Sequence, residues 1–343
     1  MVRSKSIEER KAVQNVMATI RNAEKVLREQ HPILNHQNAI AASILIFSML
    51  GMVATGIGYY LGFLPALAVI PINCFLASLT HELEHDLIHK MYFKTSKALY
   101  AVMMMGVWIA RPNTVNPWMR RDLHLHHHST SGTPSDVEER ILGNGMSWFT
   151  PLRALCTLDP TISAVVQTLS FRRIKGNKFT TGRLFVSGAP FLMLHDVVVY
   201  GWVLLTVLKA TQGLPEALAQ TYAVMSFLMV TWLGPNIMRH TILSFVSSNI
   251  HYYANEKSGE AIDSRVKQCQ VLDTPLVWPL HLFCAAFGQT HGIHHYVPKQ
   301  AWWVRTMIRK EATTAMIEAG VRHNDLGTFF RANRWPGSAK KEE

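Results

Sequence analysis

A long stretch without a charged residue, Ala39–Tyr60, sets the strongest limit on the fold of this chain. As a helix it would be about 33 Å long, enough to cross the hydrocarbon core of a bilayer. Inside lipid, a single spanning segment must pair its backbone N–H and C=O groups with one another, and the α-helix does this. The sequence therefore predicts a helical integral membrane protein.

A second apolar run, Pro65–Leu79, follows closely and leads directly to His81. The uncharged turn Gly58–Pro65 between the two runs predicts a helical hairpin. The segment Ala98–Ala110 is apolar but too short to cross a bilayer, which favours a re-entrant or interfacial helix. Charged residues make up 17% of the chain and the mean hydropathy is +0.09. Soluble domains contain about 25% charged residues, so this composition also favours a membrane protein.

Two later apolar segments complete the predicted set of spans. The third is Leu184–Leu208, and the fourth runs from Tyr222 to Leu233 and on through Gly234 and Pro235 to Ile250. The predicted fold is an all-α membrane protein with about four transmembrane helices in two hairpins and a cytoplasmic helical cap. The predicted organisation is an N-terminal segment 1–35, a membrane domain 36–300 and a C-terminal tail 301–343.

The distribution of Lys and Arg predicts the orientation in the membrane. Of the 34 basic residues, 7 precede the first span, 13 lie in residues 85–183, 12 follow His251, and the other two are Lys209 and Arg239. Basic residues concentrate on the cytoplasmic side of membrane proteins, so both termini and the central loop are expected there. The expected location is a bacterial inner membrane. The net charge of +11 also raises nucleic-acid binding, but the basic residues are dispersed and match no such motif.

The N-terminal segment has apolar residues at helical spacing, among them Val13, Val16 and Ile20. This pattern predicts an amphipathic helix, either on the membrane surface or simply solvated. The four cysteines form no C-x-x-C pair, which argues against a disulfide framework, a zinc ribbon or a built-in rubredoxin-like electron carrier.

Histidines gather in three clusters, each on the predicted cytoplasmic side. The first is H-E-L-E-H-D-L-I-H, the second is H-L-H-H-H and the third is H-G-I-H-H. In the first cluster, spacings of four residues place the imidazoles on one helix face, where they can bind a metal. The neighbouring acids Glu82, Glu84 and Asp86 are candidate hydrogen-bond acceptors for these imidazoles. Eight or more imidazoles exceed the four positions of one zinc ion, so two metals are expected.

Imidazole binds Fe, Zn, Cu and Ni, so the spacing does not identify the metal. Residues His81–His85 also read H-E-x-x-H, the motif of zinc proteases, with Glu82 as the general base. An intramembrane protease would leave at least one whole cluster without a role. A divalent-metal transporter is a further alternative, but its ligands are expected near the middle of the bilayer.

The three histidine boxes between pairs of membrane helices resemble the membrane fatty acid desaturase and hydroxylase superfamily, over roughly residues 40–300. The resemblance implies two Fe²⁺ ions that use O2 to attack an unactivated C–H bond. It also implies a histidine ligand between the last span and the third box, for which His251 is favoured over His240, and Asn249 could act through a water. Participation of His89 is left open. The predicted metal ligands are His81, His85, His89, His124, His127, His128, His251, His291, His294 and His295.

The resemblance implies a fatty acid or fatty-acyl substrate, and desaturation is the favoured reaction. The alternatives are oxidative decarboxylation of a medium-chain acid to a terminal alkene and hydroxylation of the alkyl chain. Electrons are expected from a separate ferredoxin-like donor with its reductase. Lys299 and Arg305, which follow the third box, are candidates for binding a carboxylate or acyl-carrier head group or, equally, lipid phosphates. Trp302 and Trp303 are candidates for anchoring the chain at the membrane interface.

Overall fold

A computed structural model of the chain describes residues 7–133, 135–138, 148–171, 178–252, 262 and 264–331. The outer ends of the two predicted terminal segments, 1–6 and 332–343, lie outside the described residues. Almost all regular structure is helical. The helices are α1 (Ile7–Gln30), α2 (Gln37–Tyr60), α3 (Ala66–Ile88), α4 (Lys97–Ala110), α5 (Pro117–Thr130), α7 (Pro151–Leu158), α8 (Pro160–Phe171), α9 (Thr181–Gly188), α10 (Phe191–Thr211), α11 (Glu216–Leu228), α12 (Gly234–Ile250), α13 (Arg265–Gln268), α14 (Trp278–Phe283), α15 (Phe287–Tyr296), α16 (Trp302–Met307), α17 (Arg309–Glu318) and α18 (Thr328–Arg331). A short parallel pair joins β1 (Gln270–Val271) to β2 (Arg322–His323).

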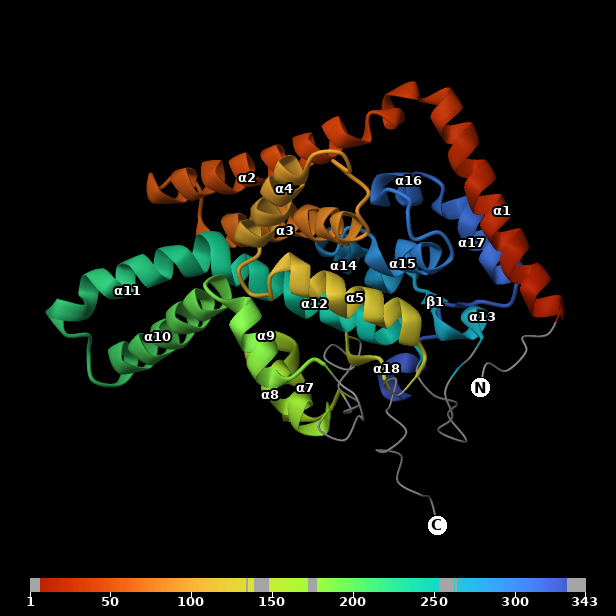
Figure 1. The fold of residues 1–343 in the computed structure, drawn as a ribbon. Helices are drawn as coiled ribbons and strands as arrows, with labels where there is room; N and C mark the ends of the chain where they lie inside the picture. The colour runs from red at the N-terminus through yellow and green to blue at the C-terminus, as the bar shows by residue number, and fades with distance from the viewer. Residues whose placement is uncertain are drawn as a thin grey trace, which may run out of the picture.

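Four helical segments of the described chain are long and apolar enough to cross a membrane, as predicted. They are α2, α3, α10 and the continuous segment Glu216–Ile250, which contains α11 and α12. Figure 1 shows α10 and α11 side by side at the left, with α2 and α3 above them. On α2, the side chains of Ile46, Leu50, Val53 and Ile57 recur at helical spacing and are exposed. Such an outward apolar stripe suits contact with lipid.

The third span begins later than the sequence predicted. Leu184 belongs to the separate helix α9, which ends at Gly188, and the span α10 starts at Phe191. The break falls at Ala189 and Pro190. Proline has no N–H to continue the hydrogen bonding of the preceding helix, so the apolar run is divided there.

The fourth span passes through the predicted Gly234 and Pro235 without ending. Between α11 and α12 the helix widens to one π-turn, Met229–Leu233. Pro235 has no N–H to offer the carbonyl of Thr231, four residues earlier. Asn73 of α3 donates a hydrogen bond from Nδ2 to that carbonyl at 2.7 Å, and Thr55 of α2 donates to Asn73 Oδ1 at 2.6 Å. This polar contact joins three spans where the bilayer offers no water.

Replacing Asn73 with Leu, which has a similar volume, is expected to lower the unfolding free energy by about 1–3 kcal/mol, because it leaves the buried Thr231 carbonyl without this donor. The measurement is the melting temperature of the purified protein in detergent. Ser78→Ala is the matched control, since the Ser78 hydroxyl bonds only to Phe75 O of its own helix among the described contacts. Equal melting temperatures for Asn73→Leu and the wild type would contradict this role.

The predicted amphipathic helix is present as α1, and its apolar stripe is covered by protein. Val16 and Ile20 are buried in a cluster with Ile293 of α15 and Met316 of α17. Figure 1 shows α1 along the right edge of the molecule with α17 beside it. The interpretation of this stripe as a membrane-surface face is therefore wrong for Val16 and Ile20, since neither side chain is free to contact lipid.

Candidate metal centre

Four parts of the fold carry the clustered histidines to one place. They come from the end of α3, from α5, from the residue after α12 and from α15, which meet at the centre of Figure 1. Each of these helices packs against at least one of the others. All the histidines of the centre are buried except His128, which is partly buried. Segments far apart in sequence thus form one interior site.

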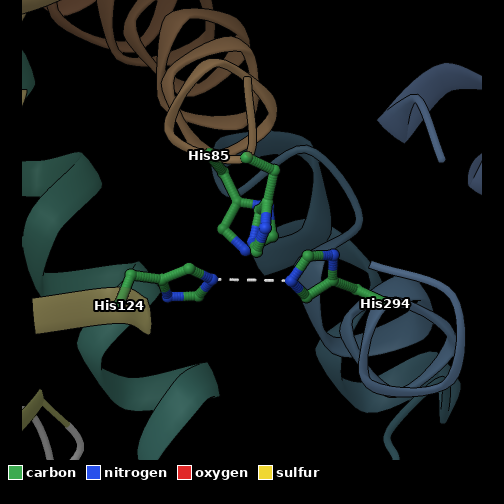
Figure 2. Close-up of side chains that lie close together, drawn as sticks. His85, His124 and His294 are labelled. Atoms are coloured by element: carbon green, nitrogen blue, oxygen red, sulfur yellow. Dashed lines mark hydrogen bonds between the residues drawn. The ribbon is translucent and has the colours of Figure 1, made fainter. Parts of the chain in front are cut away.

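One group of imidazoles consists of His85, His89, His124 and His294, with ligand atoms within 4.8 Å of one another. Figure 2 shows the rings of His85, His124 and His294 directed toward a common point from three different elements. The Nε2 atoms of His124 and His294 are 3.4 Å apart. The Nε2 atom of His128 lies 3.0 Å from that of His124 and 2.8 Å from that of His294, so His128 joins this group.

The second group consists of His127, His251, His291 and His295, also with ligand atoms within 4.8 Å of one another. His295 lies at its centre. The Nε2 atom of His295 is 3.4 Å from that of His127, 3.3 Å from that of His251 and 3.0 Å from that of His291.

These two groups fit a pair of metal ions. Ligand nitrogens about 2.1 Å from a metal in tetrahedral geometry are about 3.4 Å from one another, close to the observed Nε2 separations. Both ring nitrogens of His85 and the Nε2 atom of His89 are buried without a hydrogen-bond partner. A buried polar atom without a partner costs about 1–3 kcal/mol, and coordination of a metal would remove that cost.

The surroundings keep the imidazoles in the neutral form that binds metal. Burial lowers the pKa of His89 and that of His251 to about 4. Burial likewise lowers the pKa values of His124, His291, His294 and His295 below their usual range. At neutral pH these rings carry no charge, so their lone pairs are available to a cation.

Two carboxylates orient imidazoles of the second histidine cluster through their Nδ1 atoms. Asp136 Oδ2 lies 2.7 Å from His127 Nδ1, and Glu138 Oε2 lies 2.9 Å from His124 Nδ1. A carboxylate can only accept, so each Nδ1 carries the proton and each Nε2 is free to bind metal. Neither acid was among the predicted hydrogen-bond acceptors, although the stretch S-D-V-E-E follows the second box closely.

The acids predicted to accept hydrogen bonds from the imidazoles mostly pair with arginines instead. Glu82 Oε1 lies 3.3 Å from His81 Nδ1, but Glu84 forms ion pairs with Arg111 and Arg120. Asp86 Oδ1 is 3.9 Å from His85 Nδ1, too far for a hydrogen bond, and 3.2 Å from Arg305 Nη2. The acids of the first cluster therefore chiefly neutralise buried arginines.

His81 and His89 differ from what the sequence pattern suggested for metal binding. His81 lies outside both groups, with its Nε2 atom 3.3 Å from Arg120 Nη2. His89, which was left open, is in the first group. His240 and Asn249 are in neither group, although the Oδ1 atom of Asn249 is buried without a hydrogen-bond partner. The structure thus brings together nine of the ten predicted ligands.

Arg305 is an internal residue, and its pairing with two acids argues against its suggested role in binding a substrate head group or lipid phosphates. Its side chain is 1% exposed, and Nη2 lies 3.3 Å from Glu82 Oε2 as well as near Asp86. Its Nη1 atom lies 3.2 Å from His294 Nδ1, which makes Arg305 a neighbour of the first group. Trp303 is also internal, stacked on Tyr92 with ring centroids 5.6 Å apart, and so does not anchor the chain at the interface.

Most of the chain matches the model of a known protein family. The family model described as "Fatty acid desaturase" matches residues 60–327, a range that contains every histidine of both groups. No curated protein matches the chain significantly.

Proposed function

The chain belongs to the fatty acid desaturase family, and from this we propose that it is an O2-dependent di-iron oxidoreductase acting on an unactivated C–H bond of a fatty acid or fatty-acyl chain. The observation that carries the proposal is the pair of buried imidazole groups. An alkyl C–H bond is too weakly acidic for a side-chain base to deprotonate. Two bound iron ions would supply the activation of O2 and the removal of hydrogen.

The residues of the chain hold and shield this centre. We propose His85, His89, His124, His128 and His294 as ligands of one ion and His127, His251, His291 and His295 as ligands of the other. Asp136 and Glu138 fix the orientation of their imidazoles. Burial excludes water, which protects the reaction from unwanted quenching. Desaturation is the proposed reaction, as the family description suggests.

The zinc-protease alternative is not supported by the geometry of H-E-x-x-H. His81 is outside the two groups, and Glu82, the would-be general base, is 3.3 Å from Arg305 Nη2. Glu82 is thus engaged as the counter-ion of a buried guanidinium, and the first histidine of the motif is not among the grouped imidazoles.

The proposed topology places two helical hairpins in the membrane and a helical cap with the histidine boxes on the cytoplasmic side, together with both termini. This follows the distribution of basic residues rather than any contact in the fold. The division into segments 1–35, 36–300 and 301–343 belongs to this proposal. The electron donor is proposed to be a separate ferredoxin-like protein with its reductase, docking on the basic face.

The test combines metal analysis with product analysis. The protein is expressed in a bacterial host with a ferredoxin and its reductase, and saturated acids of several lengths are supplied. We expect about two iron ions per chain by mass spectrometry and, by gas chromatography, an internal double bond at unchanged chain length. A terminal alkene one carbon shorter, or a hydroxylated chain, would replace desaturation by one of the alternative reactions. One tightly bound zinc and no lipid product would overturn the proposal.

A further inference from the structure

A cavity of about 120 Å³ lies beside the metal centre, among α5, α8, α9, α10 and α12. Its walls are mainly apolar, with Leu123, Val165, Phe185, Leu192 and Leu243 among the lining residues. Two polar lining residues also belong to the surroundings of the metal centre. Glu138 accepts a hydrogen bond from His124, and Arg120 lies 3.7 Å from Glu138. A molecule in this cavity would therefore be close to the first imidazole group.

Among the described residues, the arginines that line the cavity or share an acid with a lining arginine outnumber the acids that pair with them. Arg111 pairs with Glu84, and Arg120 lies 3.4 Å from Glu84 and 3.7 Å from Glu138. Arg239 also lines the cavity but forms no ion pair with any described residue. The guanidinium of Arg239 is thus left without an acid in the part of the chain that the structure describes.

Arg239 is nearly as buried as Arg111 and more buried than Arg120. Arg239 is 2% exposed. Its hydrogen bonds within the described residues are two long ones at 3.5 Å, to the amide oxygens of Asn236 and Asn113. A guanidinium is charged at every physiological pH, and a buried charge without a counter-ion is strongly unfavourable. Within the described residues, the guanidinium of Arg239 has no carboxylate counter-ion.

The depth of Arg239 in the membrane suits binding of the charged end of an amphiphile. It follows Glu216, the first residue of the span, by 23 residues (239 − 216), or about 35 Å of helix. The hydrocarbon core is about 30 Å thick, so Arg239 lies near the edge of the bilayer if Glu216 lies at the other edge. A lipid-like molecule with one charged end is positioned at that depth.

We propose that the substrate is bound as a free fatty acid, with its carboxylate on the guanidinium of Arg239 and its alkyl chain against the apolar walls of the cavity. The planar fork of arginine matches a carboxylate with two parallel hydrogen bonds. An acyl thioester carries no charge at its carbonyl and would leave Arg239 without a counter-ion. The inference rests on the proposed function, because it names the substrate class of that same centre.

The experiment measures binding of radiolabelled dodecanoate to the purified full-length protein in detergent, with dodecanol and methyl dodecanoate as competitors. In the wild type, the acid is expected to bind at least tenfold more tightly than either neutral analogue. Arg239→Gln is expected to weaken acid binding at least tenfold and to leave dodecanol binding unchanged. Arg183→Gln is the matched control, since Arg183 is exposed and pairs with Asp122 at 3.6 Å, and it should behave as wild type.

Wild-type competition needs no variant, so it tests the inference even if Arg239→Gln fails to fold. Equal affinity of the wild type for the acid and the alcohol would overturn it, as would unchanged acid binding by Arg239→Gln. Iron content and product analysis separate this failure from that of the proposed function. A protein with two irons that desaturates an acyl thioester but does not prefer the acid would refute only the free-acid inference.

Discussion

His295→Ala is expected to remove turnover and to release metal from the second imidazole group. His295 Nε2 lies within 3.4 Å of the Nε2 atoms of His127, His251 and His291, so it contacts every other ring of that group. Even residues behind a ligand typically change metal affinity or activity by about 10–100-fold, and loss of a ligand is expected to exceed that range. The measurements are iron per chain and product formed per minute.

His126→Ala is the matched control for this variant. His126 lies inside the same H-L-H-H-H cluster as three proposed ligands, but its Nε2 atom faces Ser135 O at 2.9 Å, and it is in neither group. Its removal is expected to leave iron content and activity close to the wild type. If His295→Ala kept both iron ions, or if both variants lost them equally, the two-group arrangement would be refuted.

Arg305→Met is expected to destabilise the whole protein. It leaves Glu82 and Asp86 buried without their shared counter-ion, and breaking a buried ion pair by removing one partner costs about 3–5 kcal/mol. For a chain of this size that corresponds to a fall in melting temperature of about 6–20 °C. The measurement is thermal unfolding of the purified protein in detergent.

The cause can be separated from loss of packing by a second substitution. Adding Glu82→Gln to Arg305→Met removes one of the orphaned charges and is expected to restore part of the stability. Arg309→Met is the surface control, because Arg309 is exposed and its only described contact is with Thr306 O of its own segment. An Arg305→Met protein as stable as the control would show that the buried pairs contribute nothing.

The first histidine cluster shows where sequence reasoning reached its limit. His81, His85 and His89 are spaced by four residues, so a helix presents all three on one face and the spacing treats them alike. What separates them is a contact from another element. Arg120 of α5 occupies the Nε2 side of His81, whereas His85 and His89 lie next to His124 and His294. No periodicity in α3 contains that information.

The same limit applies to the carboxylates and to the amphipathic helix. An acid next to a histidine in sequence suggested a hydrogen bond between them, but Asp86 pairs with Arg305. The acid that contacts His127 is Asp136, nine residues later in the chain. In α1, the apolar spacing correctly predicted one buried face. It could not distinguish lipid from α17 as the cover, because both select the same apolar side chains.

The sequence by itself determined that this chain has four apolar helices of membrane-spanning length and three patterned histidine boxes, because hydropathy over about 20 residues and ligand spacing along a helix are local properties. Tertiary structure decided which nine imidazoles meet, which acids stand behind them and which arginine is left beside the cavity. Those choices depend on contacts between segments far apart in the chain, where packing and charge pairing select one partner among several that the local pattern allows.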